Sequence, residues 1–288
     1  MKRFILAIVL VLAFGANSWA INLRPYMQTP PEVQVFAKRV IEDGGQVVDL
    51  EFCQKYTRLA KQLLTWDSGK FVGDANMGVK LNSGVSVQTL YDLSGNNNDA
   101  VQATPANQPV WTAGVQNGRA GMVFDGTNDL LTRSTFGLSG SLSIIAVAMS
   151  NLTNDLESIV SDGGGATDGY TLDRTGVGQN TFKWWAYDGD WLGVASATVT
   201  SGVHFLVSAT HDSANMNIYI NSGAPNTQAQ GGMIQSTTAM AIGRHAATDE
   251  ARRYLNGDEC HLSIFDTNLT TAQRQALENF CNAYYSIY

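Results

Sequence analysis

The sequence has little charge and no concentration of basic residues. Only 15% of its 288 residues are charged, with 18 Lys and Arg against 25 Asp and Glu, whereas globular proteins average roughly 25%. Nucleic-acid binding needs clustered Lys and Arg to neutralise phosphates, so we expect no nucleic-acid partner. A hydrophobic content of 44% also excludes a disordered acidic tail. Uncharged polar residues must therefore cover most of the surface.

Cysteine is also scarce. The chain has three, Cys53, Cys260 and Cys281, which cannot all pair within one chain. No C-x-x-C or histidine-rich spacing accompanies them, so a metal site at these cysteines is less favoured than a disulfide. Cys260 lies in an alternating apolar run and is predicted to face a core. Cys53 and Cys281 fall in two predicted helices, and a disulfide between them is left open.

The N-terminus has the pattern of an export signal. Lys2 and Arg3 precede the apolar run Phe4–Phe14, and small residues follow up to Ala20, which is typical of a secretory signal peptide cleaved after Ala20. The run is shorter than the about 20 apolar residues of a membrane span. We therefore predict a signal peptide over residues 1–20 and a secreted, periplasmic or cell-surface protein, with a virion surface as a further location. No stable membrane span is expected after cleavage.

Helical patterns follow the signal. Residues 21–69 are predicted to form a linker and a helical prefix, because Thr29 and Glu32 fit a capping box and apolar residues then recur at helical spacing. The sequence Asp43–Gly45 ends this first helix. A second helix is predicted from Asp49 to about Thr65.

Residues 70–288 are predicted to form an all-β sandwich with a C-terminal helix. From about residue 70 the apolar period changes from 3.6 to 2, and Gly, Asn and Asp recur between short β-rich runs. The clearest predicted strands are 122–124, 142–149, 170–172, 182–187, 203–209, 216–220 and 260–265. Asp188–Gly189 indicates a type I′ hairpin turn. The last helix is predicted to begin at Thr270, which forms a capping box with Gln273. It is expected to bury Ala272, Ala276, Leu277, Phe280 and Tyr284.

A series of motifs resembles one family of sandwiches. The motifs are LYDLSGNNNDA at 90–100, NQP at 107–109, GMVFDGTND at 121–129, VHFLVSA at 203–209, NIYIN at 217–221, AIGR at 241–244 and YLNGD at 254–258. In their order and spacing, across residues 75–285, the chain resembles the LamG-type, concanavalin A-like jelly rolls, a group that includes lectins and glucanases. The resemblance implies two stacked antiparallel sheets and a carbohydrate-binding role, with a glycan or a cell-surface polysaccharide as partner.

The prefix suggests a different role. Residues 39–49, RVIEDGGQVVD, resemble a segment that precedes such jelly rolls in phage and prophage structural proteins. This likeness implies a structural fibre or decoration protein at a virion or cell surface. A homo-oligomer would then be expected.

One aromatic cluster is the candidate sugar platform. Aromatic rings stack on pyranose faces, and amides and carboxylates hold the hydroxyls. In the run 182–191, FKWWAYDGDW, strand alternation places Trp185 and Tyr187 on the lysine-bearing, exposed face, with Trp191 across the hairpin. These three residues form the candidate carbohydrate-binding site. The alternative is that they merely cover the sandwich.

Calcium is the one cofactor that the resemblance implies. Asp92, Asp99, Asp125 and Asp258 lie in predicted turns that could hold it through carboxylates and carbonyls. However, His261 stands where the family often carries an acid. Asx-type turns without a metal are the alternative.

An enzyme of this fold is the third hypothesis. Glycosidases need two facing carboxylates, and the E-x-D-x-x-E pattern of the glucanase branch is absent. LYDLSGNNND also resembles an arabinofuranosidase catalytic domain, but that family's adjacent cysteine pair is missing. The isolated acids are interpreted as turn formers or surface groups: Glu157, Asp162, Asp168, Asp173, Asp188, Asp190 and Glu259. No histidine has a Ser, Cys or His partner at a spacing typical of a catalytic pair, so no catalytic residue is assigned.

Overall fold

The computed structural model describes residues 29–134, 137–138, 140–153, 156–163, 169–174, 176, 178–233, 239–245 and 253–288. The predicted signal peptide and nearly all of the linker lie outside these residues. Within the described ranges, no helix is both long and apolar enough to cross a membrane.

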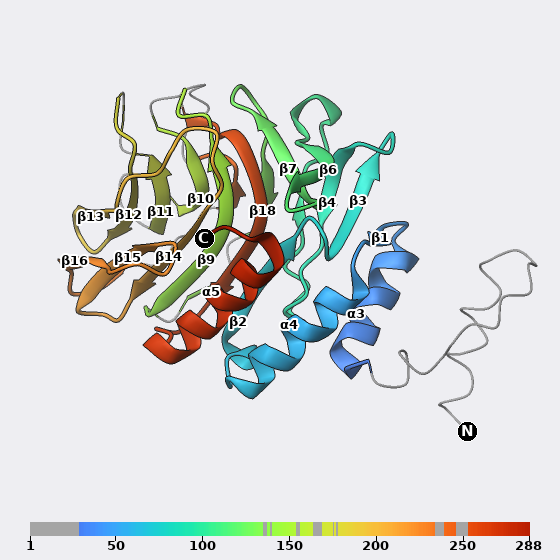
Figure 1. Ribbon diagram of the computed structural model, residues 1–288, viewed down its shortest axis with the longest axis horizontal. Coiled ribbons are helices and arrows are strands. Elements are labelled where there is room, and N and C mark those ends of the chain that lie inside the picture. Colours follow the sequence, from blue (N-terminus) through green and yellow to red (C-terminus); the bar gives the residue numbers. More distant parts are fainter. Residues whose placement is uncertain are drawn as a thin grey trace, which may run out of the picture.

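The strands are antiparallel and form two stacked layers (Figure 1), which hydrogen bonds at one edge join into a single folded sheet. Each layer is called a sheet below. In the first sheet, β18 (Asn256–Phe265) is central and pairs along one edge with β9 (Leu142–Ser150). Its other edge pairs first with β7 (Arg119–Asp125) and then with β2 (Gly69–Asp74). The sheet continues outward from β9 through β14 (Phe205–His211), β15 (Asn215–Ile220) and β16 (Asn226–Ala229), and from β7 to β6 (Val110–Gln116).

The second sheet lies against the first. Its order is β13 (Trp191–Ala195), β12 (Phe182–Tyr187), β11 (Gly169–Arg174), β10 (Ser158–Gly163), β17 (Met240–Ile242), β8 (Leu131–Arg133), β5 (Ala100–Val101), β4 (Ser86–Leu90), β3 (Gly78–Asn82) and β1 (Gln46–Val47). The pair Ser86–Val110 joins the two sheets. The predicted all-β, two-sheet sandwich is confirmed.

Strand β9 is buried on both faces, which explains its uninterrupted apolar run. Ile144, Ala146 and Ala148 point into the core between the sheets. Ile145 and Val147 point to the other face, where they join a second core. A strand covered on both sides needs no alternation of polar residues.

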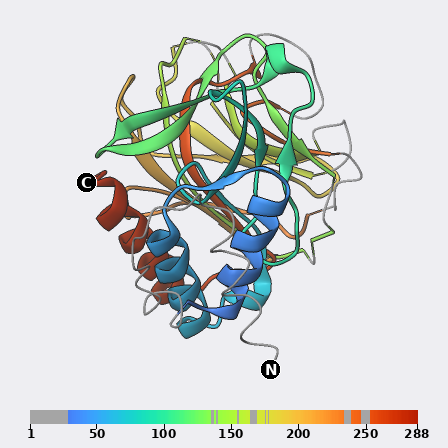
Figure 2. The same cartoon turned by 90° about the vertical axis from the view of Figure 1, so that its right-hand side faces the viewer.

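Three helices cover that outer face. These are α3 (Pro31–Glu42), α4 (Leu50–Gln62) and α5 (Thr271–Tyr285), which lie together on one side of the strands (Figure 2). The second core contains Phe36 of α3, Phe52 of α4 and Leu277 of α5 together with Val147 of β9. The helical prefix and the C-terminal helix therefore pack on the same sheet. Two short 3-10 helices, η1 (Trp66–Ser68) and η2 (Pro105–Asn107), complete the described elements.

The helix ends differ from the predictions at two places. The Thr29–Glu32 capping box is wrong, because the cap of α3 is Pro30 without a side-chain hydrogen bond. Thr29 instead accepts a hydrogen bond from the Gln54 amide of α4 at 2.9 Å. Helix α4 begins after Asp49, whose side chain accepts from the backbone N–H of Phe52, but it ends at Gln62 rather than near Thr65.

Helix α5 has the predicted cap and part of the predicted buried face. Thr270 and Gln273 form the capping box. Leu277 is buried as predicted, Ala276, Phe280 and Tyr284 are half-buried, and Ala272 is exposed. The other buried residues are Arg274, Glu278, Cys281 and Tyr285. The face is shifted because Arg274 and Glu278 form a buried ion pair, which an apolar pattern cannot reveal.

Two local predictions are also corrected. The β12–β13 turn is not type I′, because Tyr187 pairs directly with Trp191 and three residues lie between them. Of these three, only Gly189 has a positive φ, of 127°, whereas a type I′ turn needs two such residues. The three cysteines are buried and free, so Cys53 and Cys281 form no disulfide. Cys260 faces a core as predicted.

Candidate functional site

The aromatic candidates lie on the outward face of the β12–β13 hairpin. Along β12, Phe182, Trp184 and Ala186 are buried in the core between the sheets. The alternate residues Lys183, Trp185 and Tyr187 are half-buried, so the predicted orientation of this strand is confirmed. One side of the hairpin thus faces the core and the other faces outward.

Trp191 lies directly across the hairpin from Tyr187. Their ring centroids are 5.5 Å apart with planes at 59°. Trp185 packs against Gly193 of the neighbouring strand, since a Cβ placed on Gly193 would lie 2.4 Å from the indole. The Lys183 ammonium lies 4.6 Å from the Trp185 ring centre. Three aromatic side chains and one cation therefore share this face, which we call the aromatic face.

A buried acid adjoins the aromatic face. Asp173 of β11 is directly opposite Lys183, and Thr171 is opposite Trp185. The Asp173 carboxyl accepts hydrogen bonds from the hydroxyls of Ser158 and Thr171. Burial raises the pKa of Asp173 to about 7, although these hydroxyls oppose the shift. At neutral pH this carboxyl can both donate and accept hydrogen bonds.

Several acids interpreted as turn or surface groups are in fact buried. Glu157, Asp162, Asp173 and Glu259 are all less than 5% exposed, because they lie within strands or next to them rather than in turns. Only Asp188 and Asp190, in the hairpin loop, are exposed as expected. Asp168 lies outside the described residues.

Glu259 is the most isolated of these acids. It pairs with Ala148 of β9, whose side chain points into the core between the sheets. Its two carboxylate oxygens have no hydrogen-bond partner among the described residues. Burial raises the pKa of Glu259 well above its usual range, because removal from water disfavours the charged form.

The four acids proposed for calcium do not converge on one site. Asp92 accepts hydrogen bonds from the backbone N–H groups of Val72, Ser94 and Asn98. Asp99 accepts from Asp92 N and pairs with Arg39. Asp125 accepts from three successive backbone N–H groups, as in an Asx-type turn. Asp258 lies on strand β18 rather than in a turn.

His261 belongs to a buried polar cluster that sequence reasoning missed. Its Nδ1 lies 2.8 Å from Asp74 Oδ2 and its Nε2 lies 2.6 Å from Ser263 Oγ. Tyr56 of α4 and Tyr285 of α5 extend the cluster, through Ser263 and Asp74 respectively. Burial acts to lower the pKa of His261, but Cys281 and Asp74 raise it to about 10.

This cluster joins the helices to the sheet. All five of its side chains are no more than 1% exposed, so no substrate reaches the Asp–His–Ser arrangement. Asp74 and His261 are 187 positions apart in the sequence, and no local spacing could have indicated their contact.

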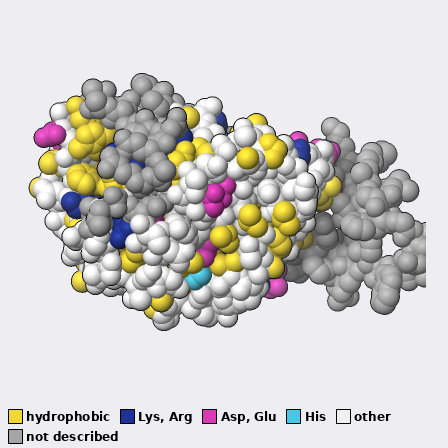
Figure 3. Space-filling view, turned by 90° about the horizontal axis from the view of Figure 1, so that it is seen from above, with side chains coloured by type: hydrophobic (Ala, Val, Ile, Leu, Met, Phe, Trp, Pro, Cys, Tyr) yellow, Lys and Arg dark blue, Asp and Glu magenta, His cyan; other side chains and the backbone are white. Residues whose placement is uncertain are grey.

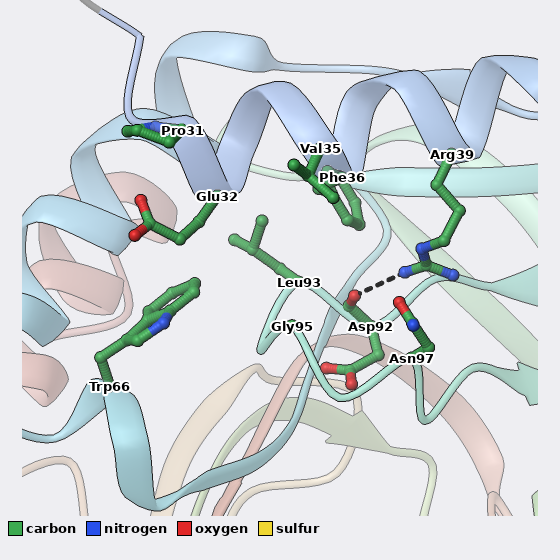
Figure 4. A pocket seen from close by; sticks show the side chains of 10 residues that line it. All are labelled: Pro31, Glu32, Val35, Phe36, Arg39, Trp66, Asp92, Leu93, Gly95 and Asn97. Atoms are coloured by element: carbon green, nitrogen blue, oxygen red, sulfur yellow. Dashed lines mark hydrogen bonds between the residues drawn. The ribbon is translucent and has the colours of Figure 1, made fainter.

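A cavity of about 320 Å³ lies between α3, η1 and the loop after β4. Figure 4 shows Trp66 and Val35 at its sides, Leu93 between them, and the Arg39 guanidinium directed at the Asp92 carbonyl. Its charged groups are already engaged, since Arg39 pairs with Asp99 and Glu32 pairs with Lys61. It is large enough for a small ligand and is the alternative site to the aromatic face.

Charged groups are sparse elsewhere on the visible surface. The face seen in Figure 3 is mostly uncharged polar side chains and backbone, with charged side chains scattered over it. This agrees with the low charge of the sequence and offers no basic surface on that face.

Comparisons with known proteins support the fold. No family model matches the chain, and no curated protein sequence matches it. The binding domain of Paraclostridial Mosquitocidal Protein 1 matches with a TM-score of 0.54 and 13% identity, over 76% of this chain and 53% of that one. The receptor binding domain of botulinum neurotoxin D matches with a TM-score of 0.52 and 14% identity, over 75% and 53%.

An enzyme shares the same architecture. A mutant GH54 α-L-arabinofuranosidase soaked with 4-nitrophenyl α-L-arabinofuranoside matches with a TM-score of 0.52 and 10% identity, over 69% of this chain and 51% of that one. The chain thus spans about half the length of each of these structures. At such low identities the likeness establishes the sandwich fold alone.

Proposed function

We propose that this protein binds carbohydrate through the aromatic face of the β12–β13 hairpin. The observation that carries the proposal is the arrangement of Trp185, Tyr187 and Trp191 on one outward face. Sugar rings present C–H groups that pack on aromatic rings, and polar groups beside the rings hold the hydroxyls. Lys183, beside the Trp185 ring, supplies such a group here.

The similar structures agree with this proposal at the level of the fold. Two of them are named as binding domains and one acts on a sugar. Export to a surface, adhesion and a fibre or decoration role rest on sequence patterns alone.

Removing the aromatic rings should weaken sugar retention. We expect Trp185→Ala and Trp191→Ala to weaken binding to any glycan retained by the wild-type chain at least about tenfold, or about 1.4 kcal/mol. A glycan array identifies the ligand, and affinity electrophoresis in the matching polysaccharide measures the loss. Circular dichroism confirms that each variant is folded.

Two further variants locate the site. Gly193→Ala keeps every aromatic residue but displaces the Trp185 indole, so binding should also weaken. Trp66→Ala removes a half-buried indole from the cavity beside α3 and should leave binding unchanged. Unchanged binding by folded Trp185 and Trp191 variants would refute the aromatic face, and loss in Trp66→Ala would move the site to the cavity.

Hydrolysis is the second candidate, because Asp173 has the raised pKa of a general acid beside the aromatic face. A glycosidase also needs a second carboxylate across the sugar. Release of reducing sugar from the same polysaccharide panel, lost in Asp173→Asn, would favour this candidate over binding alone.

A further inference from the structure

Three side chains capable of binding a metal meet on the first sheet. His204 lies just before β14, and Asp258 and Cys260 lie on β18. One donor atom from each lies within 4.8 Å of the other two. His204 Nε2 is 2.6 Å from Asp258 Oδ1, and Cys260 Sγ is 3.7 Å from the same oxygen.

We propose that His204, Asp258 and Cys260 form a binding site for a divalent transition metal, with zinc the best match. The site is on the sheet opposite the aromatic face and does not depend on carbohydrate binding. An imidazole nitrogen, a thiolate sulfur and a carboxylate oxygen are the three donor types that zinc takes in proteins.

The distances suit a tetrahedral ion after a small adjustment. Zinc bonds of about 2.0 to 2.3 Å place neighbouring tetrahedral ligands roughly 3.3–3.8 Å apart. The contact between Cys260 and Asp258 is already in this range. The His204–Asp258 contact must lengthen by less than about 1 Å, and the His204–Cys260 pair, which lies within 4.8 Å, must close by up to about 1 Å. Rotation of the His204 side chain can supply both changes.

The surroundings favour a cation. Cys260 and Asp258 are buried, and only His204 is partly exposed, which leaves one route from solvent. The Asp258 carboxylate, beside both the His204 imidazole and the Cys260 thiol, supplies negative charge at the centre of the cluster.

Calcium does not fit this donor set. It takes six to eight oxygen ligands, whereas this cluster offers one nitrogen, one sulfur and one carboxylate. Asp258, one of the four acids expected to hold calcium, is thus placed with ligands that suit a transition metal instead. Three protein ligands would leave a fourth position for water.

Cobalt titration of the reduced wild-type chain tests the proposal directly. We expect Co²⁺ to bind in a one-to-one ratio and to give the visible bands of a tetrahedral ion together with a thiolate-to-cobalt charge-transfer band. Zinc should displace the cobalt and raise the thermal midpoint by several degrees relative to chelator. Absence of both signals in the folded wild-type chain overturns the proposal without any variant.

Variants assign the ligands. Cys260→Ala should remove the charge-transfer band, and His204→Gln should weaken Co²⁺ binding at least about 100-fold, more than loss of an outer hydrogen-bond partner costs. Cys53→Ala removes a buried thiol outside the cluster and should bind as the wild type does. A band that persists in folded Cys260→Ala, or disappears in Cys53→Ala, would refute this ligand set.

Discussion

At the scale of single residues, two buried acids link the stability of the fold to pH. Glu259 points into the core between the sheets and Asp173 lies under the aromatic face, and burial raises the pKa of each. Hydroxyls contact Asp173, whereas Glu259 has no hydrogen-bond partner among the described residues. Removing a carboxylate from water disfavours its charged form, so both groups link stability to pH.

Because of Asp173, the stability of the fold should fall as the pH rises from about 4 to about 7. Its pKa in the folded chain is raised to about 7 from the usual 3.8, so the folded state holds this proton more tightly than the unfolded state. The stabilising contribution is complete below about pH 4 and is lost as the pH rises through about 7. Asp173→Asn should therefore match the wild type near pH 4 and be more stable at pH 8, by up to about 4 kcal/mol.

Urea unfolding at pH 4, 6 and 8 measures this difference. Asp188→Asn, in the exposed hairpin loop, is the control and should show little change at any pH. A difference between Asp173→Asn and wild type that is equal at all three pH values would contradict the raised pKa.

Residue-level prediction succeeded where alternation decides orientation. The outward direction of Lys183, Trp185 and Tyr187 follows from the two-residue period of a strand, and the structure agrees. The prediction failed for the buried acids. An acid buries its carboxyl only beside a polar partner, and the sequence does not show which residue that partner is. The partners of Asp173 come from Ser158 and Thr171 on two strands, and the contact of His204 with Asp258 spans 54 positions.

At the scale of elements, α5 shows how a charged pair alters a helix face. Arg274 pairs with Glu278 one turn later, and both are buried. The guanidinium also lies 3.6 Å from the Tyr219 ring centre of β15, and the Ser222 hydroxyl donates to Glu278. The apolar stripe was therefore an incomplete guide, and Phe280 and Tyr284 stack on Phe52 of α4 instead.

Breaking this ion pair should be costly. Glu278→Ala leaves the Arg274 cation buried without its carboxylate, and we expect the free energy of unfolding to fall by about 3–5 kcal/mol. The double variant Arg274→Met/Glu278→Leu should recover most of this loss. Denaturant unfolding of the two variants measures both values.

An exposed pair provides the comparison. Lys55 and Glu51 on α4 are also four residues apart, at 2.9 Å, but both are exposed. Lys55→Ala should change stability by no more than about 0.5 kcal/mol. A similarly small effect of Glu278→Ala would show that the buried pair does not hold α5 in place.

At the scale of the whole molecule, two cores share one sheet. The inner core fills the space between the sheets, and the outer core fixes the three helices to β2, β9, β14 and β18. Sequence periods predicted the strands, the helices and the sandwich. They did not predict that the prefix packs on the sheet, because contacts between residues far apart in sequence leave no local pattern.

The outer core contains all three thiols. Cys53, Cys260 and Cys281 are each 0% exposed and free. With chelator present, none of the thiols of the native chain should react with a disulfide reagent, whereas all three should react after denaturation. A single reactive thiol after denaturation without reductant would instead indicate a Cys53–Cys281 disulfide.

The placement of β18 has a consequence for how the chain acquires its structure. This strand hydrogen-bonds with β2, β7 and β9, yet it begins at Asn256, after every other described strand has been synthesised. Until it arrives, three strand edges stay open, and open edges invite association between chains. A chain that has not yet placed β18 therefore exposes three strand edges through which it can pair with its neighbours, and placing this one strand closes all three at once.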